Sequence, residues 1–459
     1  MIKILFVSPS NFTTSSELVT IPIGLSYIKS YCENNISCSI KIVHQINKKV
    51  ISDEKPDIVG ISCFAATFGH ALKISLLCKE LGIHVVVGGE QITTLPHIIS
   101  KDIDVGVRGE GEHTFLKLLQ IYDNGWDKNK LRNINGLVFY DDGKLVLTGY
   151  AQPLLDLDDL PIPDLLYGNK SSDILCLMSS RGCPYRCAYC ATGYHNNVHW
   201  MSPAKVIETI EFHLDKYPHI KRVKFWDDLF TVKFERVEEI ANLMQAKGLT
   251  ERVVVTICTR SDHINESLLK VLKKMNCTHV SMGLESGCDK TLKYINKMTT
   301  VEKNRRAVEL LDKHGFDSEA SFIIGFPEET TENIRQTYDF VKSSPIKKIQ
   351  VFLPMPYPGT KIWEFAMEKG LVSENMDWER LDLIATMNQP KQVLDEFIVI
   401  AQRVSREELC RWMLKFRRLR LKKSAVYALQ LLFRDPRLIF HRLRRDLVFF
   451  LRKVVFKPD

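Results

Sequence analysis

The chain has 459 residues, of which 45% are hydrophobic and 26% are charged, with a formal net charge of +8. This composition is typical of a globular protein with a sizeable core, and the length allows two or three domains. The 12 cysteines are spread over the whole chain, which excludes the dense framework of a small secreted disulfide scaffold. No run reaches the ~18 apolar residues of a membrane span, and Pro9 interrupts the first apolar stretch too early for a signal peptide. We therefore expect a protein of the reducing cytoplasm.

The first 150 residues alternate short apolar runs with helical patterns. The apolar runs predict buried strands, and Pro22 stands near the start of the first predicted helix. Alternation at this spacing is typical of a doubly wound parallel sheet. Such sheets bind ligands at the carboxyl ends of their strands, where glycines let a large flat ligand approach the backbone. The predicted strands are residues 3–8, 39–43, 57–62, 84–89 and 105–107.

A hairpin and a linker follow this region. Residues 137–147 predict two strands joined by an Asp142-Gly143 turn. Residues 151–170 are acidic, and Pro161 and Pro163 stiffen them. We expect this linker to act as a spacer between two domains.

Six strand–helix units can be counted between residues 171 and 375. In βα barrels the chemistry lies at the carboxyl ends of the strands, so the residues directly after each strand are candidates for a site. The predicted strands are residues 174–178, 222–226, 253–258, 279–283, 319–324 and 348–353.

Three cysteines, Cys183, Cys187 and Cys190, follow the first of these strands at C-x3-C-x2-C spacing. A [4Fe–4S] cluster needs four ligands, normally cysteine thiolates, so this loop leaves the fourth iron without a protein ligand. An open coordination position is typical of a metal site that performs chemistry. The alternative is a zinc site completed by His195 or His199.

The C-terminal region, residues 376–459, is predicted to be helical and basic. Residues 411–459 hold 15 Lys and Arg against three Asp, a net charge of +12, so residues 1–410 sum to −4. Basic and apolar residues interleave up to a break at Asp435-Pro436, a pattern typical of amphipathic helices at a membrane surface or a partner. A helical pair packed on the preceding domain, with a solvated basic rim, is an equal alternative. The charge would attract nucleic acid, but no recognition module accompanies it, and we expect no nucleic-acid partner.

The cysteine loop closely resembles the signature loop of the radical S-adenosylmethionine (radical SAM) enzymes, including the aromatic Tyr189 before the last cysteine. The six strand–helix units are similar to the partial (β/α)6 TIM barrel of the same family. The resemblance implies that the open iron binds the amino and carboxylate groups of SAM. An electron passed through the cluster then splits SAM to a 5′-deoxyadenosyl radical, which implies a partner of the flavodoxin or ferredoxin type.

The N-terminal region is similar to the cobalamin-binding domain that precedes many radical SAM barrels. The matching segments are Pro22-x-Gly24-Leu25, Val59-Gly60-Ile61-Ser62, Gly88-Gly89-Glu90 with Thr93, and Arg108-Gly109-Glu110-Gly111-Glu112. The resemblance implies that cobalamin contacts come from these segments, namely from Ser62, Gly88, Gly89, Glu90, Thr93, Gly109, Glu110 and Gly111. The alternatives are a flavodoxin-like sheet whose glycines only make turns, and a domain that has lost the cofactor.

One feature of the wider cobalamin family is missing from the sequence. No Asp-x-His-x-x-Gly follows the first strand, so no histidine is offered as the lower cobalt ligand. Radical SAM members usually lack it as well, which implies a cobalt with a weak or absent lower ligand. We expect His70 and His113 to be ordinary helix residues.

The ends of the second and third barrel strands carry candidates for SAM contacts. Asp227 and Asp228 match the family position whose carboxylate accepts a hydrogen bond from the amino group of SAM. Neighbours in an extended chain point in opposite directions, and we favour Asp227, with helix capping or solvation as the alternative for one of the pair. Arg260 fits a contact with the carboxylate or sulfonium side of SAM, and a salt bridge to a barrel carboxylate is an equal alternative.

The next two strand ends complete the candidate site. Ser281 and Glu285 lie in a segment similar to the cobalamin-dependent branch of the family and are candidates for ribose or substrate contacts. Gly325 begins the segment where the family packs the adenine of SAM.

The resemblance covers about residues 1–375 and lies near a subgroup labelled anaerobic magnesium-protoporphyrin monomethyl ester cyclase-like. It implies methylation of an unactivated carbon, or occasionally phosphorus, of a small-molecule or lipid substrate through a 5′-deoxyadenosyl radical and methylcobalamin. The alternative with the same cofactors is radical oxidoreductase chemistry, namely ring closure, ring contraction or oxygenation. A non-catalytic corrinoid- or zinc-binding protein is the alternative of another class.

The predicted organisation is therefore α/β with four parts. A Rossmann-like cobalamin-binding domain spans residues 1–150, and a linker spans 151–170. The radical SAM partial barrel spans 171–375, and the helical basic region follows at 376–459. We expect a cytoplasmic enzyme, with peripheral membrane contact through the tail as an alternative.

Overall fold

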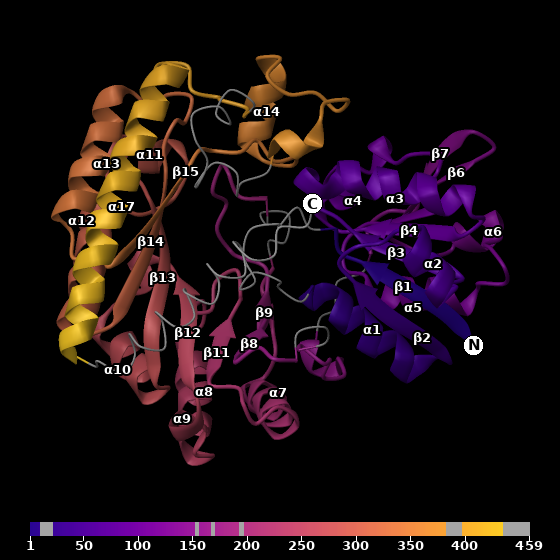
Figure 1. Cartoon of the computed structure of the whole chain (residues 1–459), viewed down its shortest axis with the longest axis horizontal. Helices are drawn as coiled ribbons and strands as arrows, with labels where there is room; N and C mark the ends of the chain where they lie inside the picture. The colour runs from indigo at the N-terminus through magenta and orange to yellow at the C-terminus, as the bar shows by residue number, and fades with distance from the viewer. Residues whose placement is uncertain (10–21, 152–155, 167–169, 192–196, 382–396, 435–459) are drawn as a thin grey trace.

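The computed structural model describes residues 1–9, 22–151, 156–166, 170–191, 197–381 and 397–434. Two α/β units lie side by side, and the chain passes from the first to the second through the predicted linker (Figure 1). The third part is a long helix that runs along the outside of the second unit.

The first unit is built on a seven-stranded sheet in the order β2-β1-β3-β4-β5-β6-β7. The first five strands are parallel, with helices on both faces, which is the predicted doubly wound arrangement. Val59 and Ile61 face one apolar core, and Ile58 faces the other, because successive side chains of a strand point to opposite faces. The strands are β1 (Ile2–Val7), β2 (Cys38–Val43), β3 (Ile58–Ser62), β4 (His84–Gly88), β5 (Val105–Val107), β6 (Leu137–Asp141) and β7 (Lys144–Leu147).

Helices cover both faces of this sheet. Leu25 of α1 and Phe115 of α5 pack into one core, while Ile51 of α2 and Phe68 of α3 pack into the other. The helices are α1 (Ile23–Asn35), α2 (Lys48–Glu54), α3 (Phe68–Glu80) and α5 (Glu112–Gln120).

The predicted hairpin extends the first sheet instead of standing apart from it. β6 and β7 pair antiparallel through Asp142 and Gly143, whose φ values of +48° and +76° fit the twist of a tight hairpin turn. β6 also pairs antiparallel with β5, through Gly106 and Val138. The hairpin therefore protects the β5 edge of the parallel sheet.

The second unit holds six parallel strands in the order β15-β14-β13-β12-β11-β8, so all six predicted barrel strands are present. Along each strand, buried side chains that pack on the helices alternate with half-buried ones that face the barrel interior. The strands are β8 (Ile174–Leu177), β11 (Arg222–Phe225), β12 (Val254–Thr259), β13 (Cys277–Glu285), β14 (Asp317–Ile323) and β15 (Lys348–Phe352).

Helices between these strands start at side-chain caps. Ser202, Asn265, Thr300 and Thr330 each accept a hydrogen bond from a backbone N–H of the first turn, which satisfies a donor that the helix leaves free. The capped helices are α7 (Pro203–Lys216), α10 (Glu266–Lys274), α12 (Val301–Lys313) and α13 (Thr331–Ser343), and α8 (Phe234–Ala246) lies between α7 and α10.

The chain after the barrel contacts both units. Trp378 stacks on Trp363 of α14 (Lys361–Glu368), with ring centres 5.8 Å apart, and meets Phe68 of the first unit edge-on at 5.9 Å. Helix α17 (Arg406–Arg434) then buries its inner face, including Trp412 and Phe416, and the predicted break at Asp435-Pro436 lies outside the described residues (Figure 1). Among the residues described, every helix is too short or too polar to span a bilayer.

We predict that two glycines with positive φ differ in how they tolerate alanine. Gly82 (φ +68°) has open space around it, whereas a Cβ on Gly89 (φ +100°) would lie 2.3 Å from the Cys63 carbonyl oxygen. Gly82→Ala should therefore lower the free energy of unfolding by about 1 kcal/mol. Gly89→Ala should lower it by about 3 kcal/mol, because the backbone must also move. Urea unfolding of the apoprotein measures both, and equal losses would contradict the prediction.

Candidate functional site

The cysteine loop lies at the carboxyl ends of the barrel strands. Cys183, Cys187 and Cys190 are half-buried and are not joined in disulfides. The loop is pinned by backbone hydrogen bonds at Ala188, whose N–H donates to Ile295 (2.9 Å) and whose carbonyl accepts from Ile362 (3.2 Å). Segments of the barrel that are distant in sequence therefore fix the position of the loop.

The three thiols suit a cluster better than a single ion. Burial raises the pKa of Cys183 and Cys187, so metal binding must displace protons from these thiols. Three soft sulfur donors fit iron–sulfur or zinc chemistry, but within the described residues no three His, Cys, Asp or Glu side chains converge on one ion. Zinc would need thiolates converging at about 2.3 Å. Of the two histidines considered as a further zinc ligand, His199 lies in β10 (His199–Trp200) and His195 lies outside the described residues. The zinc alternative gains no support from them.

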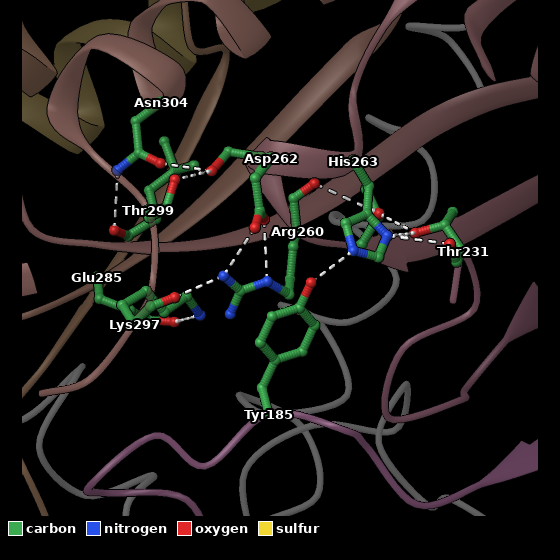
Figure 2. Close-up of polar contacts among 12 residues, drawn as sticks. Tyr185, Thr231, Arg260, Asp262, His263, Glu285, Lys297, Thr299 and Asn304 are labelled. Carbon is green, nitrogen blue, oxygen red and sulfur yellow. Dashed lines mark hydrogen bonds and ion pairs between the residues drawn. The ribbon is translucent and has the colours of Figure 1, made fainter. Parts of the chain in front are cut away.

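The ring of Tyr185 in the cysteine loop packs against the charged Arg260 side chain (Figure 2). The Arg260 guanidinium lies 3.7 Å from the centre of the Tyr185 ring, within cation–π range. Asp262 holds this guanidinium through two hydrogen bonds of 2.9 and 3.0 Å. The Tyr185 hydroxyl is 2.9 Å from Nε2 of His263, whose Nδ1 lies 2.9 Å from Thr231. Of the two roles considered for Arg260, the structure shows the salt bridge to a barrel carboxylate.

Tyr189 is held by a second charged pair, Glu285 and Lys297. Its hydroxyl donates to Glu285 (2.7 Å), and the Lys297 ammonium donates to Glu285 (2.8 Å) and to the Tyr189 oxygen (3.2 Å). Burial and the adjacent Glu285 raise the pKa of Tyr189 well above its ordinary value, so the phenol stays a donor. In the structure Glu285 thus fixes the cysteine loop, and its expected contact with ribose or substrate stays a prediction. The sequence offered no signal for Lys297, which lies in an irregular segment after α11 (Asp289–Tyr294).

Backbone geometry places the Glu285 carboxylate. Glu285 has φ +63°, a left-handed conformation that is costly for a residue with a side chain, and lies where the pairing of β13 with β14 shifts register. A Cβ on Gly283 would lie 2.2 Å from the Glu285 carboxylate oxygen, so glycine is needed two residues earlier. The strain brings the carboxylate to Tyr189.

Asp227 and Asp228 contact different parts of the cysteine loop. The buried Asp227 carboxylate accepts hydrogen bonds from the Ser179 amide (2.6 Å) and hydroxyl (2.9 Å) and from the Ser180 amide. Burial raises its pKa to about 6. The exposed Asp228 accepts from the Gly182 amide (3.0 Å), next to Cys183. Asp228 is therefore the more accessible carboxylate of the pair, and the contact of either aspartate with SAM stays a prediction.

The remaining barrel candidates lie at different depths. Gly325 forms a turn with φ +97°, and the buried Glu329 carboxylate accepts from the amides of Gly325 (2.6 Å) and Phe326 (3.3 Å). Burial raises the pKa of Glu329 to about 7. The Phe326 ring is 6.2 Å from that of Tyr189, which places this turn beside the cysteine loop. Ser281 pairs in register with Cys258 in the middle of the sheet and lies deeper in the barrel.

A cavity of about 230 Å³ lies at the carboxyl ends of β3, β4 and β5. A Cβ on Gly60 or on Gly111 would come within 2.6 Å of Phe6 or Ile28, so these walls require glycine. A mostly apolar cavity with glycine walls fits part of a large flat ligand such as cobalamin. Its lining includes six of the predicted cobalamin residues, namely Ser62, Gly88, Gly89, Gly109, Glu110 and Gly111, together with Met178 and Arg181 of the second unit.

The two remaining N-terminal candidates for cobalamin contacts are Thr93 and Glu90. The Thr93 hydroxyl donates to Gly89 (2.8 Å) and accepts from the Gly109 amide (3.0 Å), so it ties two cavity loops together. Glu90 is half-buried, and burial and the nearby Asp228 raise its pKa to about 7. His70 and His113 lie in α3 and α5 and do not line the cavity.

Comparisons with known proteins agree with this geometry. Residues 177–341 match the model of the radical SAM superfamily, and residues 11–119 match that of the B12 binding domain. An uncharacterized methyltransferase of Pyrococcus horikoshii is 31% identical over 423 residues, which cover 87% of this chain and 90% of the relative. The chain belongs to the radical SAM enzymes that carry a B12-binding domain.

Two further relatives belong to the same family. The anaerobic magnesium-protoporphyrin IX monomethyl ester cyclase of Rubrivivax gelatinosus is 27% identical, over 84% of this chain and 74% of the relative. The structure of the radical SAM methyltransferase TsrM of Kitasatospora setae, with cobalamin and a [4Fe–4S] cluster bound, shares the fold at a TM-score of 0.68. It is 18% identical, over 81% of this chain and 78% of that one. The predicted α/β fold and the three predicted cofactors, a [4Fe–4S] cluster, SAM and cobalamin, are thereby confirmed.

We predict that alanine at the two neighbouring aspartates has different effects on stability in this radical SAM enzyme. Asp227→Ala leaves two buried amides and a hydroxyl without their acceptor and should lower the free energy of unfolding by about 3 kcal/mol. Asp228→Ala removes an acceptor at an exposed position, where water can replace it, and should cost about 1 kcal/mol or less. Urea unfolding of both apoproteins makes the comparison, and a larger loss for Asp228→Ala would overturn these assignments.

The raised pKa of Glu90 predicts a pH-dependent stability. Because the pKa is raised in the folded state, the stability that neutral Glu90 contributes is complete below its ordinary range and is lost as pH rises through about 7. Glu90→Gln removes this dependence. Between pH 5 and 8, its stability relative to the wild type should therefore rise by about 2 kcal/mol. Glu80→Gln, on the exposed surface of α3, serves as the control, and parallel pH curves for Glu90→Gln and the wild type would refute the prediction.

Proposed function

We propose that this enzyme methylates an unactivated carbon, or occasionally phosphorus, of a small-molecule or lipid substrate. The observation that carries the proposal is that one residue joins the two cofactor sites, through its side chain on one side and its backbone on the other. Arg181 lines the glycine-walled cavity of the first unit and lies two residues before Cys183. A substrate between the units is then near both sites. The names of the Pyrococcus relative and of TsrM support methyl transfer.

Named residues take separate roles in this proposal. Cys183, Cys187 and Cys190 hold three irons of the cluster and leave the fourth open to SAM. The Asp228 carboxylate accepts from the amino group of SAM, and the turn at Gly325 packs its adenine. When bound, the cluster supplies the electron that cleaves SAM, and cobalamin carries the methyl group.

The overall reaction fixes what else the enzyme needs. Replacement of a C–H bond by C–CH₃ consumes two SAM molecules and two electrons, with S-adenosylhomocysteine, methionine and 5′-deoxyadenosine as the other products. One SAM gives the methyl group, and the other accepts the hydrogen atom through its adenosyl carbon. An external low-potential donor of the flavodoxin or ferredoxin type supplies the electrons.

Cobalamin-dependent ring closure or oxidation is the second candidate. It is favoured by the similarity to the magnesium-protoporphyrin cyclase of Rubrivivax gelatinosus over 84% of this chain. Both candidates use the same two cofactor sites, and they differ in whether the methyl group of SAM leaves the enzyme on the product.

The basic tail supports a peripheral contact with an anionic membrane. The inner face of α17 packs on the barrel. Leu414, Leu421 and Leu429 of the same helix are exposed among basic residues. An exposed apolar stripe beside cationic side chains suits a lipid surface better than a nucleic acid. Co-sedimentation of the full chain with anionic but not neutral vesicles tests this contact.

The proposal predicts the fate of the SAM methyl group. Protein reconstituted under anaerobic conditions is incubated with cobalamin, a low-potential reductant and SAM that carries a deuterated methyl group. Mass spectrometry of the recovered cobalamin should show the added deuterated methyl group, and no substrate needs to be known. Unlabelled cobalamin together with released 5′-deoxyadenosine would favour ring closure or oxidation instead.

Cys187→Ala provides the control for the cluster. Loss of one of three ligands should abolish 5′-deoxyadenosine formation, because cleavage of SAM needs the cluster. Retained formation would refute the assignment of the cysteine loop. Purified protein that lacks both iron and the brown absorbance of a cluster would favour the alternative of a non-catalytic corrinoid- or zinc-binding protein.

A further inference from the structure

Arg181 joins the two units through an ion-pair cluster with Glu110 and Glu112. Its guanidinium lies 2.6 Å from a carboxylate oxygen of Glu112 and 3.3 Å from one of Glu110. The three side chains are only 17%, 3% and 9% exposed for Arg181, Glu112 and Glu110. Removing one partner from such a buried cluster leaves an uncompensated charge, so this costs much more than breaking a surface salt bridge.

The backbone around Arg181 belongs to the barrel. Asp227 accepts from the Ser180 amide and Asp228 from the Gly182 amide, so both flanking residues are tied to the end of β11. Arg181 itself pairs with His199 in a short antiparallel ladder. The guanidinium is therefore the part of this segment that reaches into the first unit.

The carboxylates belong to the wall of the glycine-lined cavity. Glu110 and Glu112 alternate with Gly109 and Gly111, and all four residues line the cavity. Gly109 has φ +88°, and a Cβ on Gly111 would lie 2.6 Å from the Ile28 side chain, so both positions favour glycine. A ligand that shifts or orders the wall therefore acts on Arg181.

Tyr27 gives a second, independent indication that a polar ligand group binds in the cavity. It also lines the cavity, and its ring lies 5.5 Å from the Arg181 guanidinium. In the part of the chain that the structure describes, its buried hydroxyl has no hydrogen-bond partner. An unpaired buried hydroxyl is costly unless a ligand or water satisfies it.

We propose that Arg181 is a positioning residue that couples the two cofactor sites: occupation of the cobalamin cavity, acting through Glu110 and Glu112, sets the position of the cysteine loop. The coupling is reciprocal by thermodynamic necessity, so a formed cluster must strengthen cobalamin binding. This inference concerns cofactor assembly, and it holds for methyl transfer and ring closure alike.

The test measures cobalamin affinity with and without the cluster. Hydroxocobalamin is titrated, with absorbance as readout, into anaerobic full-length protein before and after cluster reconstitution. In the wild type, the cluster should lower the dissociation constant at least about fivefold. In Arg181→Gln the two dissociation constants should be equal. Arg222→Gln, which breaks an exposed barrel ion pair with Asp173, is the matched control and should keep the difference.

A double variant separates coupling from folding. Arg181→Met with Glu112→Gln removes both members of the closest pair, so it should fold better than either single variant. It should still bind cobalamin and show no dependence on the cluster. The proposal is overturned if the wild type shows no cluster dependence. It is also overturned if Arg181→Gln keeps that dependence, or if the variants weaken cobalamin binding equally with and without the cluster.

Discussion

The structure of the site depends on how an irregular loop is held by residues of distant strands. Residues 182–190 contain no helix or strand, so their own backbone hydrogen bonds do not fix them. Asp228 holds Gly182 at the start of the loop, Arg260 supports Tyr185, and Glu285 with Lys297 fixes Tyr189. A loop that must place three thiols around one cluster needs this support, because a ligand displaced by an ångström no longer binds well.

Burial makes each of these contacts stronger. Charged groups in a region shielded from water interact more strongly than at the surface, and unpaired ones cost more. The raised pKa values of Asp227, Glu90 and Glu329 show that the surroundings of the site disfavour free charge. Closed surroundings of this kind also suit radical chemistry, since they keep water and side reactions away from reactive species.

The comparison with relatives places the protein in a family without choosing its substrate. A methyltransferase and a cyclase match most of the chain at 31% and 27% identity. The matched regions cover 87% and 84% of this chain.

The sequence by itself determined the two α/β units, the strands along the chain and the cysteine loop. Hydrophobic runs, turn residues and ligand spacing are local signals, and they place candidates at the carboxyl ends of parallel strands. All six barrel strands were predicted for this reason. The family resemblance of the motifs then named the cofactors.

Only the tertiary structure decided what the individual side chains do. Asp227 and Asp228 look equivalent in sequence, but one binds Ser179, 48 residues away, and the other binds Gly182, 46 residues away. The contact between Tyr189 and Glu285 spans 96 residues and needs a left-handed backbone. The salt bridge between Arg181 and Glu112 connects the two units. No local pattern encodes these contacts, because their energy comes from burial and from partners that meet only after the chain has folded.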